Sequence, residues 1–266
     1  MTDDLTNIFN DPTFDDPATP SDFHNIDLDL YPHGDLPLQS HADLCSEPRI
    51  HVDDQFHATI DGSADDHWWN YQGDQPTCAI VAQQGVLESL VGRELPQDAL
   101  IQFAYDHGWY DPLTGTSPEC MGNIIEACGV PVERAWDCSI TDIFNALLHD
   151  EKVIVGLNAN EIWQPARDLD GNPIKQHLDG HAVWVTGAEI GDDGHPYLVL
   201  NDSAPKTGRH ERVAVEDFLN AWSDFGNYAV ITTHGLKLFQ RHKHEHEPTT
   251  SGSNSASTRR CRASIP

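Results

Sequence analysis

Basic residues are scarce in this sequence. It has 15 Lys and Arg against 43 Asp and Glu, which gives a formal net charge of −28. Nucleic-acid phosphates bind to basic faces, so this charge excludes nucleic acid as an expected partner. The chain also lacks any run near the ~20 apolar residues of a membrane span. Its first residues, Met1 to Asp4, include neither the cationic nor the apolar region of a secretory signal. We expect a cytoplasmic protein without a membrane partner, and non-classical export stays open.

The sequence also lacks a recognisable cysteine framework. Its six cysteines are spaced unlike a compact disulfide scaffold, and none of them forms the CxxC pair of a zinc site: Cys45, Cys78, Cys120, Cys128, Cys138 and Cys261. Reduced thiols are therefore the simplest expectation. We predict no metal and no cofactor, and the sequence sets no oligomeric state.

Composition divides the chain into three parts. Residues 1–65 are poor in aliphatic clusters, and between Asp3 and Asp66 there are sixteen acidic residues against one basic residue, Arg49. Such a stretch cannot bury enough apolar surface to offset chain entropy, so we predict an acidic disordered segment. Residues 241–266 are rich in serine and charge, and are also predicted to be disordered. Residues 66–240 remain as one domain of ordinary size.

Within that domain, helical patterns come first and strand patterns second. Hydrophobic periodicity predicts helices over residues 78–91, 96–107, 117–128 and 139–149. Apolar runs then predict strands over residues 152–157, 182–186, 197–200 and 228–232, with one more helix over residues 215–222. Helices followed by antiparallel strands indicate an α+β fold.

A cysteine stands at the start of the first predicted helix. Thr77 is a candidate N-cap, which places Cys78 in the first turn. Exposed N–H groups at a helix N-terminus lower a thiol pKa and favour the nucleophilic thiolate. Gln72 lies six residues earlier, across a loop with Gly73 and Pro76. Its amide could complete an oxyanion hole with the backbone N–H of Cys78. Taken singly, a buried structural cysteine and a solvated loop glutamine are the commoner interpretations.

A histidine and an acid stand on two neighbouring predicted strands. His181 begins one strand, and Asp202 follows the next. If the intervening turn closes around residues 191–194, paired residue numbers sum to about 385. Val183 then faces Asp202, and His181 becomes its diagonal neighbour on the same face, within roughly 5–8 Å. Such a pair would leave one imidazole nitrogen for Cys78. A slip of one residue would separate the two side chains.

These motifs together resemble the papain-like cysteine peptidases of the bacteriocin-processing type, peptidase family C-39-like, in its free-standing group. The resemblance covers residues 66–234 and consists of Gln-x5-Cys, Gly-His-Ala-Val-x-Val-x-Gly at 180–187, and Asn-Asp at 201–202. It implies a papain-like fold in which Cys78, His181 and Asp202 form a catalytic triad and Gln72 lines the oxyanion hole. Thr77 and Ala79 depart from that pattern, which usually has Asp before the cysteine and Gly after it, so double-glycine leader cleavage is not implied.

The resemblance implies a cysteine peptidase that acts on a peptide or protein substrate through a Cys-His-Asp triad, without a cofactor. Two alternatives remain. The same residues would serve an amidase or acyl transferase if an amine replaced water. A catalytically inactive peptide-binding module would keep the fold with Cys78 merely buried.

Overall fold

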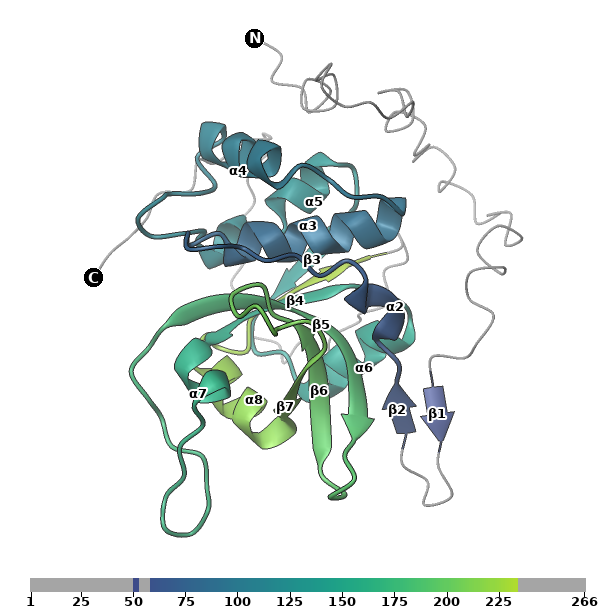
Figure 1. Cartoon of the computed structure of the whole chain (residues 1–266), viewed down its shortest axis with the longest axis vertical. Coiled ribbons are helices and arrows are strands. Elements are labelled where there is room, and N and C mark those ends of the chain that lie inside the picture. Colours follow the sequence, from purple (N-terminus) through teal and green to yellow (C-terminus); the bar gives the residue numbers. More distant parts are fainter. Residues whose placement is uncertain (1–49, 53–57, 234–266) are drawn as a thin grey trace, which may run out of the picture.

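The computed structural model describes residues 50–52 and 58–233. They form an α+β fold in which helices pack on a mainly antiparallel sheet (Figure 1). The strands are β1 (Ile50–Val52), β2 (Ala58–Ile60), β3 (Val132–Ala135), β4 (Val153–Asn158), β5 (Gly180–Ile190), β6 (Pro196–Asn201), β7 (Glu211–Ala214) and β8 (Ala229–Thr232). The helices are α2 (Ser63–Asp66), α3 (Cys78–Val91), α4 (Gln97–Asp106), the 3-10 turn η3 (Pro118–Cys120), α5 (Asn123–Ala127), α6 (Ile140–Leu148), α7 (Ala159–Trp163) and α8 (Val215–Ser223).

The sheet is organised around the long strand β5. The strand order is β1-β2-β5-β4-β8-β3, β6 also pairs with β5, and β7 pairs with β6. Each strand pair is antiparallel. The β5–β6 register shifts between Val185 and Gly187, which marks a bulge. Strands β4, β5 and β6 therefore lie side by side, and β5 begins at the residue just before His181.

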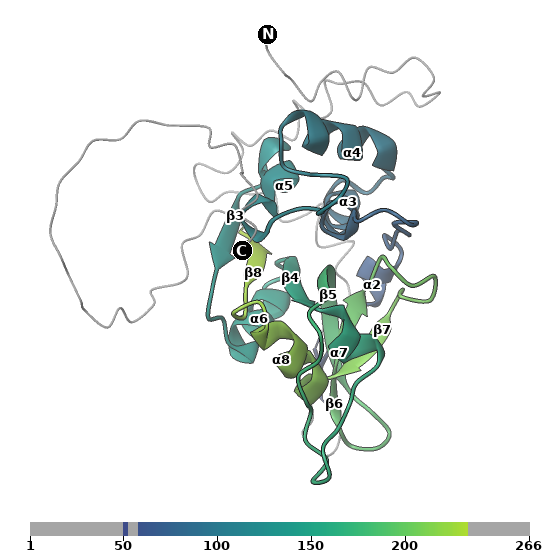
Figure 2. The same cartoon turned by 90° about the vertical axis from the view of Figure 1, so that its left-hand side faces the viewer.

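Alternating side chains give the sheet two buried faces. In β4, Val153, Val155 and Leu157 belong to the core that includes residues of α6 and α8, whereas Ile154 belongs to the core with α3, α4 and α5. Figures 1 and 2 show α3, α4 and α5 together on one side of the sheet and α6 and α8 on the other. A strand that is buried on both faces has apolar residues at successive positions. This pattern made the strand at residues 152–157 recognisable from the sequence.

Most predicted elements are confirmed, but one helix is wrong. A single helix was expected over residues 117–128, and the structure has η3 and α5 separated at Gly122. Gly122 has φ +89°, and a Cβ there would stand 2.7 Å from Cγ1 of Val230. Packing of this turn against β8 therefore interrupts the helix. The prediction also missed β3, α7 and β7, which are only four or five residues long.

The sequence predicted that the folded domain begins at residue 66, but the structure has strands and a helix before that residue. Strands β1 and β2 pair with each other, Ile60 of β2 pairs with Ala188 of β5, and α2 follows. The carboxylate of Asp65 is buried and forms an ion pair with Lys152. The remaining predictions of disorder, for residues 1–49, 53–57 and 241–266, fall outside the described residues. Within the described part of the chain, no helix has the length and apolar character needed to cross a bilayer.

Candidate active site

Helix α3 presents Cys78 at its first position. The carbonyl of Thr77 accepts hydrogen bonds from the N–H groups of Ile80 and Val81, which starts the helix. The expected side-chain cap is absent: Thr77 makes no capping bond, and its buried hydroxyl has no hydrogen-bond partner among the described residues. The prediction that Cys78 lies in the first turn is confirmed, whereas the prediction that the Thr77 hydroxyl caps the helix is wrong.

His181 and Asp202 are in direct contact. The β5–β6 ladder pairs Trp184 with Asn201 and Val185 with Leu200, sums of 385 as predicted, but the pairs nearer the turn sum to 386, and the unpredicted bulge after Val185 gives the predicted register at this end. One step further along this register, His181 becomes the diagonal neighbour of Asp202. Nε2 of His181 lies 2.6 Å from Oδ1 of Asp202, and both side chains are buried. A single hairpin, formed by β5 and β6, thus brings the two residues together.

The remaining imidazole nitrogen of His181 is left for Cys78, since Nε2 is used by Asp202. The groups that favour the Cys78 thiolate are the imidazole of His181 and the backbone at Ala182 and Ala79. Burial opposes ionisation of Cys78, but the hydrogen bond and charge of His181 outweigh it and lower the thiol pKa below its ordinary value. Burial also works against the imidazolium of His181. Its bonds to Asp202 and Cys78 prevail and raise the His181 pKa to about 10. The arrangement favours a thiolate–imidazolium pair.

Two tryptophans that sequence reasoning missed hold Asp202. Nε1 of Trp163 donates to Oδ2 at 2.8 Å, and Nε1 of Trp69 donates to the backbone carbonyl at 2.5 Å. The N–H of Ala204 donates to Oδ1 at 2.9 Å. Burial raises the pKa of Asp202, but the bond and charge of His181, with the donors of Ala204 and Trp163, keep it below its ordinary value. Neither tryptophan is fully buried, so the sequence held no signal beyond the ability of an indole N–H to donate a hydrogen bond.

Gln72 lies beside the turn that follows β6. Its backbone N–H donates to the carbonyl of Ser203 at 2.9 Å, and its Oε1 accepts from the Ser203 hydroxyl at 2.8 Å. Its Nε2 donates to the carbonyl of Gln75 at 3.0 Å. These contacts tie the Gln72 loop to the segment that carries Asp202. Among the described residues, the Gln72 amide donates only to Gln75, which leaves one amide hydrogen without an acceptor, and Gln72 forms no hydrogen bond with Cys78.

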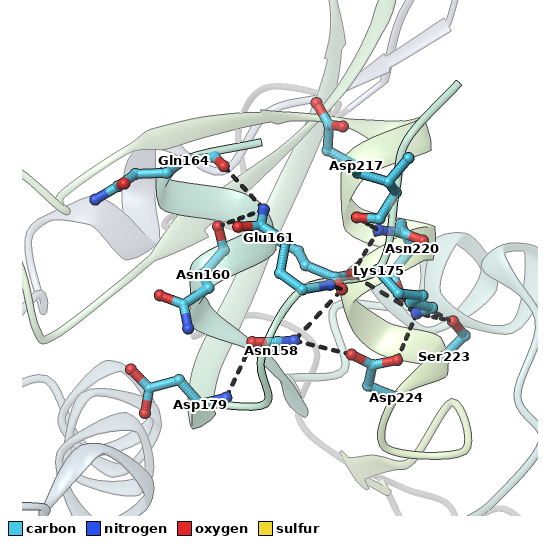
Figure 3. Close-up of polar contacts among 12 residues, drawn as sticks. Asn158, Asn160, Glu161, Gln164, Lys175, Asp179, Asp217, Asn220, Ser223 and Asp224 are labelled. Atoms are coloured by element: carbon cyan, nitrogen blue, oxygen red, sulfur yellow. Dashed lines mark hydrogen bonds and ion pairs between the residues drawn. The ribbon is translucent and has the colours of Figure 1, made fainter. Parts of the chain in front are cut away.

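A polar network around the buried side chain of Glu161 joins α7 to the segment that follows it and to α8 (Figure 3). The side chain of Glu161 is almost fully buried; it accepts from the N–H of Gln176 at 2.7 Å and from Nδ2 of Asn220 at 2.5 Å. Lys175 bonds to the hydroxyl of Ser223 at 2.7 Å. The network joins α7 and the segment after it to α8. It thereby fixes Trp163, whose indole contacts Asp202, at one end and the start of β5 at the other.

The other described cysteines differ from Cys78. Burial raises the pKa of Cys128 to about 12, and the buried thiol of Cys138 bonds to the carbonyl of Ala135. Cys120 is disulfide-bonded, whereas Cys78, Cys128 and Cys138 are free. The expectation of six reduced thiols is therefore wrong at Cys120. No group of three or more His, Cys, Asp or Glu residues suited to a metal ion occurs within the described ranges.

Comparison with known proteins gives limited information. No family model matches the chain. Uncharacterized proteins of Mycobacterium bovis and of two strains of Mycobacterium tuberculosis are 40% identical to it over 84 residues, which is 30% of this chain. The matched region spans about a third, 33%, of the length of these curated relatives. A crystal structure of a candidate C-39-like peptidase from Bacillus anthracis aligns with 62% of this chain and 93% of its own, at 12% identity and a TM-score of 0.43. At this TM-score the structural similarity does not support a conclusion about function.

Proposed function

We propose that this protein is a papain-like cysteine peptidase with Cys78 as nucleophile, His181 as its acid and base, and Asp202 as the orienting carboxylate. One arrangement carries the proposal: a histidine whose Nε2 lies 2.6 Å from a buried aspartate acts on a cysteine at the start of a helix and lowers the pKa of its thiol. This order of nucleophile, base and orienting group is the arrangement of an activated nucleophile. The motif resemblance at residues 72–78, 180–187 and 201–202 supports the same reading.

Acylation begins from the thiolate–imidazolium pair. The Cys78 sulfur attacks the carbonyl carbon of the scissile peptide bond, and the carbonyl oxygen becomes an oxyanion. The backbone N–H of Cys78 lies at the N-terminus of α3. The first N–H groups of a helix have no acceptor within the helix, so this N–H can donate to the oxyanion. The second amide hydrogen of Gln72 would be the other donor. The intermediate then collapses to a thioester as His181 gives its proton to the leaving amine.

Deacylation uses the same histidine as a base. Neutral His181 takes a proton from water as the water oxygen attacks the thioester carbonyl. Collapse of the second intermediate releases the carboxylic acid and restores the Cys78 thiolate with its imidazolium. Asp202 stays ionised throughout, because it orients the imidazole and stabilises its charged form. No step needs a redox change or an added group. An amine in place of water would give the transferase outcome with the same residues.

The test is the pH dependence of Cys78 alkylation by iodoacetamide, mapped by mass spectrometry. We expect Cys78 to label rapidly near pH 6, while Cys128 and Cys138 label slowly and serve as internal controls. His181→Ala should abolish the fast labelling without unfolding the protein, as judged by thermal denaturation. Labelling of wild-type Cys78 that rises only near the ordinary thiol pKa of about 8.5 would contradict the proposal and favour the inactive peptide-binding module. Product analysis with and without an added amine then separates peptidase from transferase.

A further inference from the structure

A second carboxyl group lies beside Asp202 and has no role in the mechanism above. Glu211 is the first residue of β7, and the β6–β7 ladder pairs it with Leu200. Asp202 is two residues beyond Leu200, so it is the diagonal neighbour of Glu211 on the same face. His181 reaches Asp202 by the same diagonal relationship from β5, on the opposite side of β6. Asp202 is thus flanked by a histidine from one strand and a glutamate from the other.

The β6–β7 register brings the carboxyl group of Glu211 beside that of Asp202, where a hydrogen bond between the two can form. Two ionised carboxylates offer only acceptors, so this bond requires a proton on one of them. Asp202 already accepts from His181, Trp163 and Ala204, which favours its ionised form. Oε2 of Glu211 is buried and receives no hydrogen bond from the described residues. The shared proton therefore belongs on Glu211.

The charges around Glu211 agree with this assignment. Burial, followed by the negative charge of Asp202 and the bond to it, raises the pKa of Glu211 to about 7, and the charge of His181 opposes the rise. The charges with the largest effect on Glu211 are those of Asp202, at the end of β6, and His181 of β5, while its chain neighbours His210 and Arg212 pair with Asp66 and Glu189. Glu211 is therefore neutral in weakly acidic solution and changes charge within the physiological range.

We propose that Glu211 is a positioning residue, which donates a hydrogen bond to Asp202 in its protonated form and holds that carboxylate in the orientation that accepts His181. The inference rests on the proposed peptidase function. Loss of the Glu211 proton removes the hydrogen bond to Asp202. It also adds a second negative charge next to Asp202, which is linked to Cys78 through His181. That charge strengthens the imidazolium form of His181 and makes it a poorer acid toward the leaving amine. The site thus has a titration of its own, well below the pH at which His181 loses its proton.

Two substitutions separate the hydrogen bond from the charge. Glu211→Gln keeps a donor toward Asp202 at every pH and cannot ionise, whereas Glu211→Leu removes both the donor and the titration. A matched control is Glu216→Gln, which removes an exposed carboxylate on α8. Thermal denaturation checks that each variant folds. The readout is the rate of Cys78 alkylation by iodoacetamide from pH 4 to 10.

We expect an inflection near pH 7 in the wild-type profile and in Glu216→Gln, and none in Glu211→Gln, which should keep the wild-type rate at pH 6. Glu211→Leu should label Cys78 roughly tenfold more slowly at pH 6, the scale of one lost hydrogen bond to a charged group. Fast labelling with the same profile in wild type and both Glu211 variants would overturn the positioning role alone. Slow labelling of wild-type Cys78 at pH 6 would overturn the proposed function, and the role of Glu211 with it.

Discussion

Gly85 of α3 lies directly against the indole of Trp184 in β5. A Cβ at residue 85 would stand 3.1 Å from two carbons of that ring and 2.8 Å from the carbonyl oxygen of Trp68. The helix that carries Cys78 therefore approaches the strand that carries His181 more closely than any residue with a side chain would allow. The glycine sets the spacing between the two halves of the candidate site.

Gly85→Ala is expected to push α3 away from β5 and slow the alkylation of Cys78 at pH 6 by at least about tenfold, since misplacement by 1 Å costs on the order of 10²-fold in aligned reactions. Overpacking costs about 1–3 kcal/mol and the better helix propensity of alanine offsets only about 1 kcal/mol, so stability should fall as well. The labelling rate and a urea unfolding curve measure the two effects. Leu90→Ala, on the exposed side of the same helix, is the control. An unchanged rate in Gly85→Ala would show that the contact does not set the Cys78–His181 geometry.

Replacing Asp202 by asparagine should make stability depend less on pH. The pKa of His181 is raised from its ordinary value of 6.5 to about 10 in the folded protein. A raised pKa stabilises the fold fully below 6.5, and this contribution is lost as the pH rises through 10. Without the Asp202 charge the His181 pKa falls, so much of that contribution disappears. Urea unfolding should show a larger deficit for Asp202→Asn at pH 6 than at pH 10.

Asp98→Asn, an exposed change in the first turn of α4, controls for loss of one carboxylate. It should shift the unfolding free energy about equally at both pH values. The interpretation fails if Asp202→Asn behaves in the same way, because the ion pair with His181 would then add nothing to folding.

Local patterns predicted the parts of the fold that extend over several residues. The apolar runs before and after residues 191–194 predicted the β5–β6 hairpin and a register within one residue of that found, whereas the bulge that brings His181 to Asp202 was not predicted. The helix predicted over residues 139–149 is also present, and the hydroxyl of Ser139 accepts from the N–H of Asp142 in a capping box at its start. These features depend on residues close together in the chain, where periodicity and side-chain chemistry are informative.

The parts that were not predicted depend on contacts between distant segments. Gly122 interrupts a helical pattern because β8 lies against it, more than a hundred residues away. Trp163 and Glu211 reach Asp202 from a five-residue helix and a four-residue strand, too short to show a period. Their roles follow only from the tertiary arrangement, which brings an indole donor and a second carboxyl group to one buried aspartate.

Trp163→Phe should weaken the site without removing the aromatic ring next to His181. The ring centroids of Trp163 and His181 are 5.2 Å apart, and phenylalanine retains that packing but loses the donor to Oδ2 of Asp202. A bond to a charged group contributes roughly 1.5–3 kcal/mol, so Cys78 alkylation at pH 6 should slow by about tenfold or more. Trp136→Phe, whose ring packs on Tyr228, is the matched control. Equal rates for the two variants would mean that the indole N–H of Trp163 does not support Asp202.

The ion pair between Lys152 and Asp65 should contribute strongly to holding α2 against the rest of the domain. Nζ of Lys152 lies 2.9 and 3.0 Å from the two carboxylate oxygens of Asp65, and both side chains are buried. Lys152→Met removes the cation and leaves the buried carboxylate of Asp65 without it. Breaking a buried pair on one side costs about 3–5 kcal/mol. Urea unfolding at pH 7 measures this loss, with the exposed Lys206→Met as control.

The double variant Asp65→Leu/Lys152→Met shows why Lys152→Met is less stable. The cause is either the loss of the attraction between the two side chains or the cost of a buried Asp65 carboxylate without the Lys152 cation. Replacing both partners of a buried pair by apolar side chains is often neutral, because neither charge then has to be desolvated. We expect the double variant to regain most of the stability that Lys152→Met loses. If it is as unstable as the single variant, the pair itself holds α2 against the sheet through its specific geometry. A loss below about 1 kcal/mol in Lys152→Met would instead mean that Asp65 is solvated as an exposed residue would be.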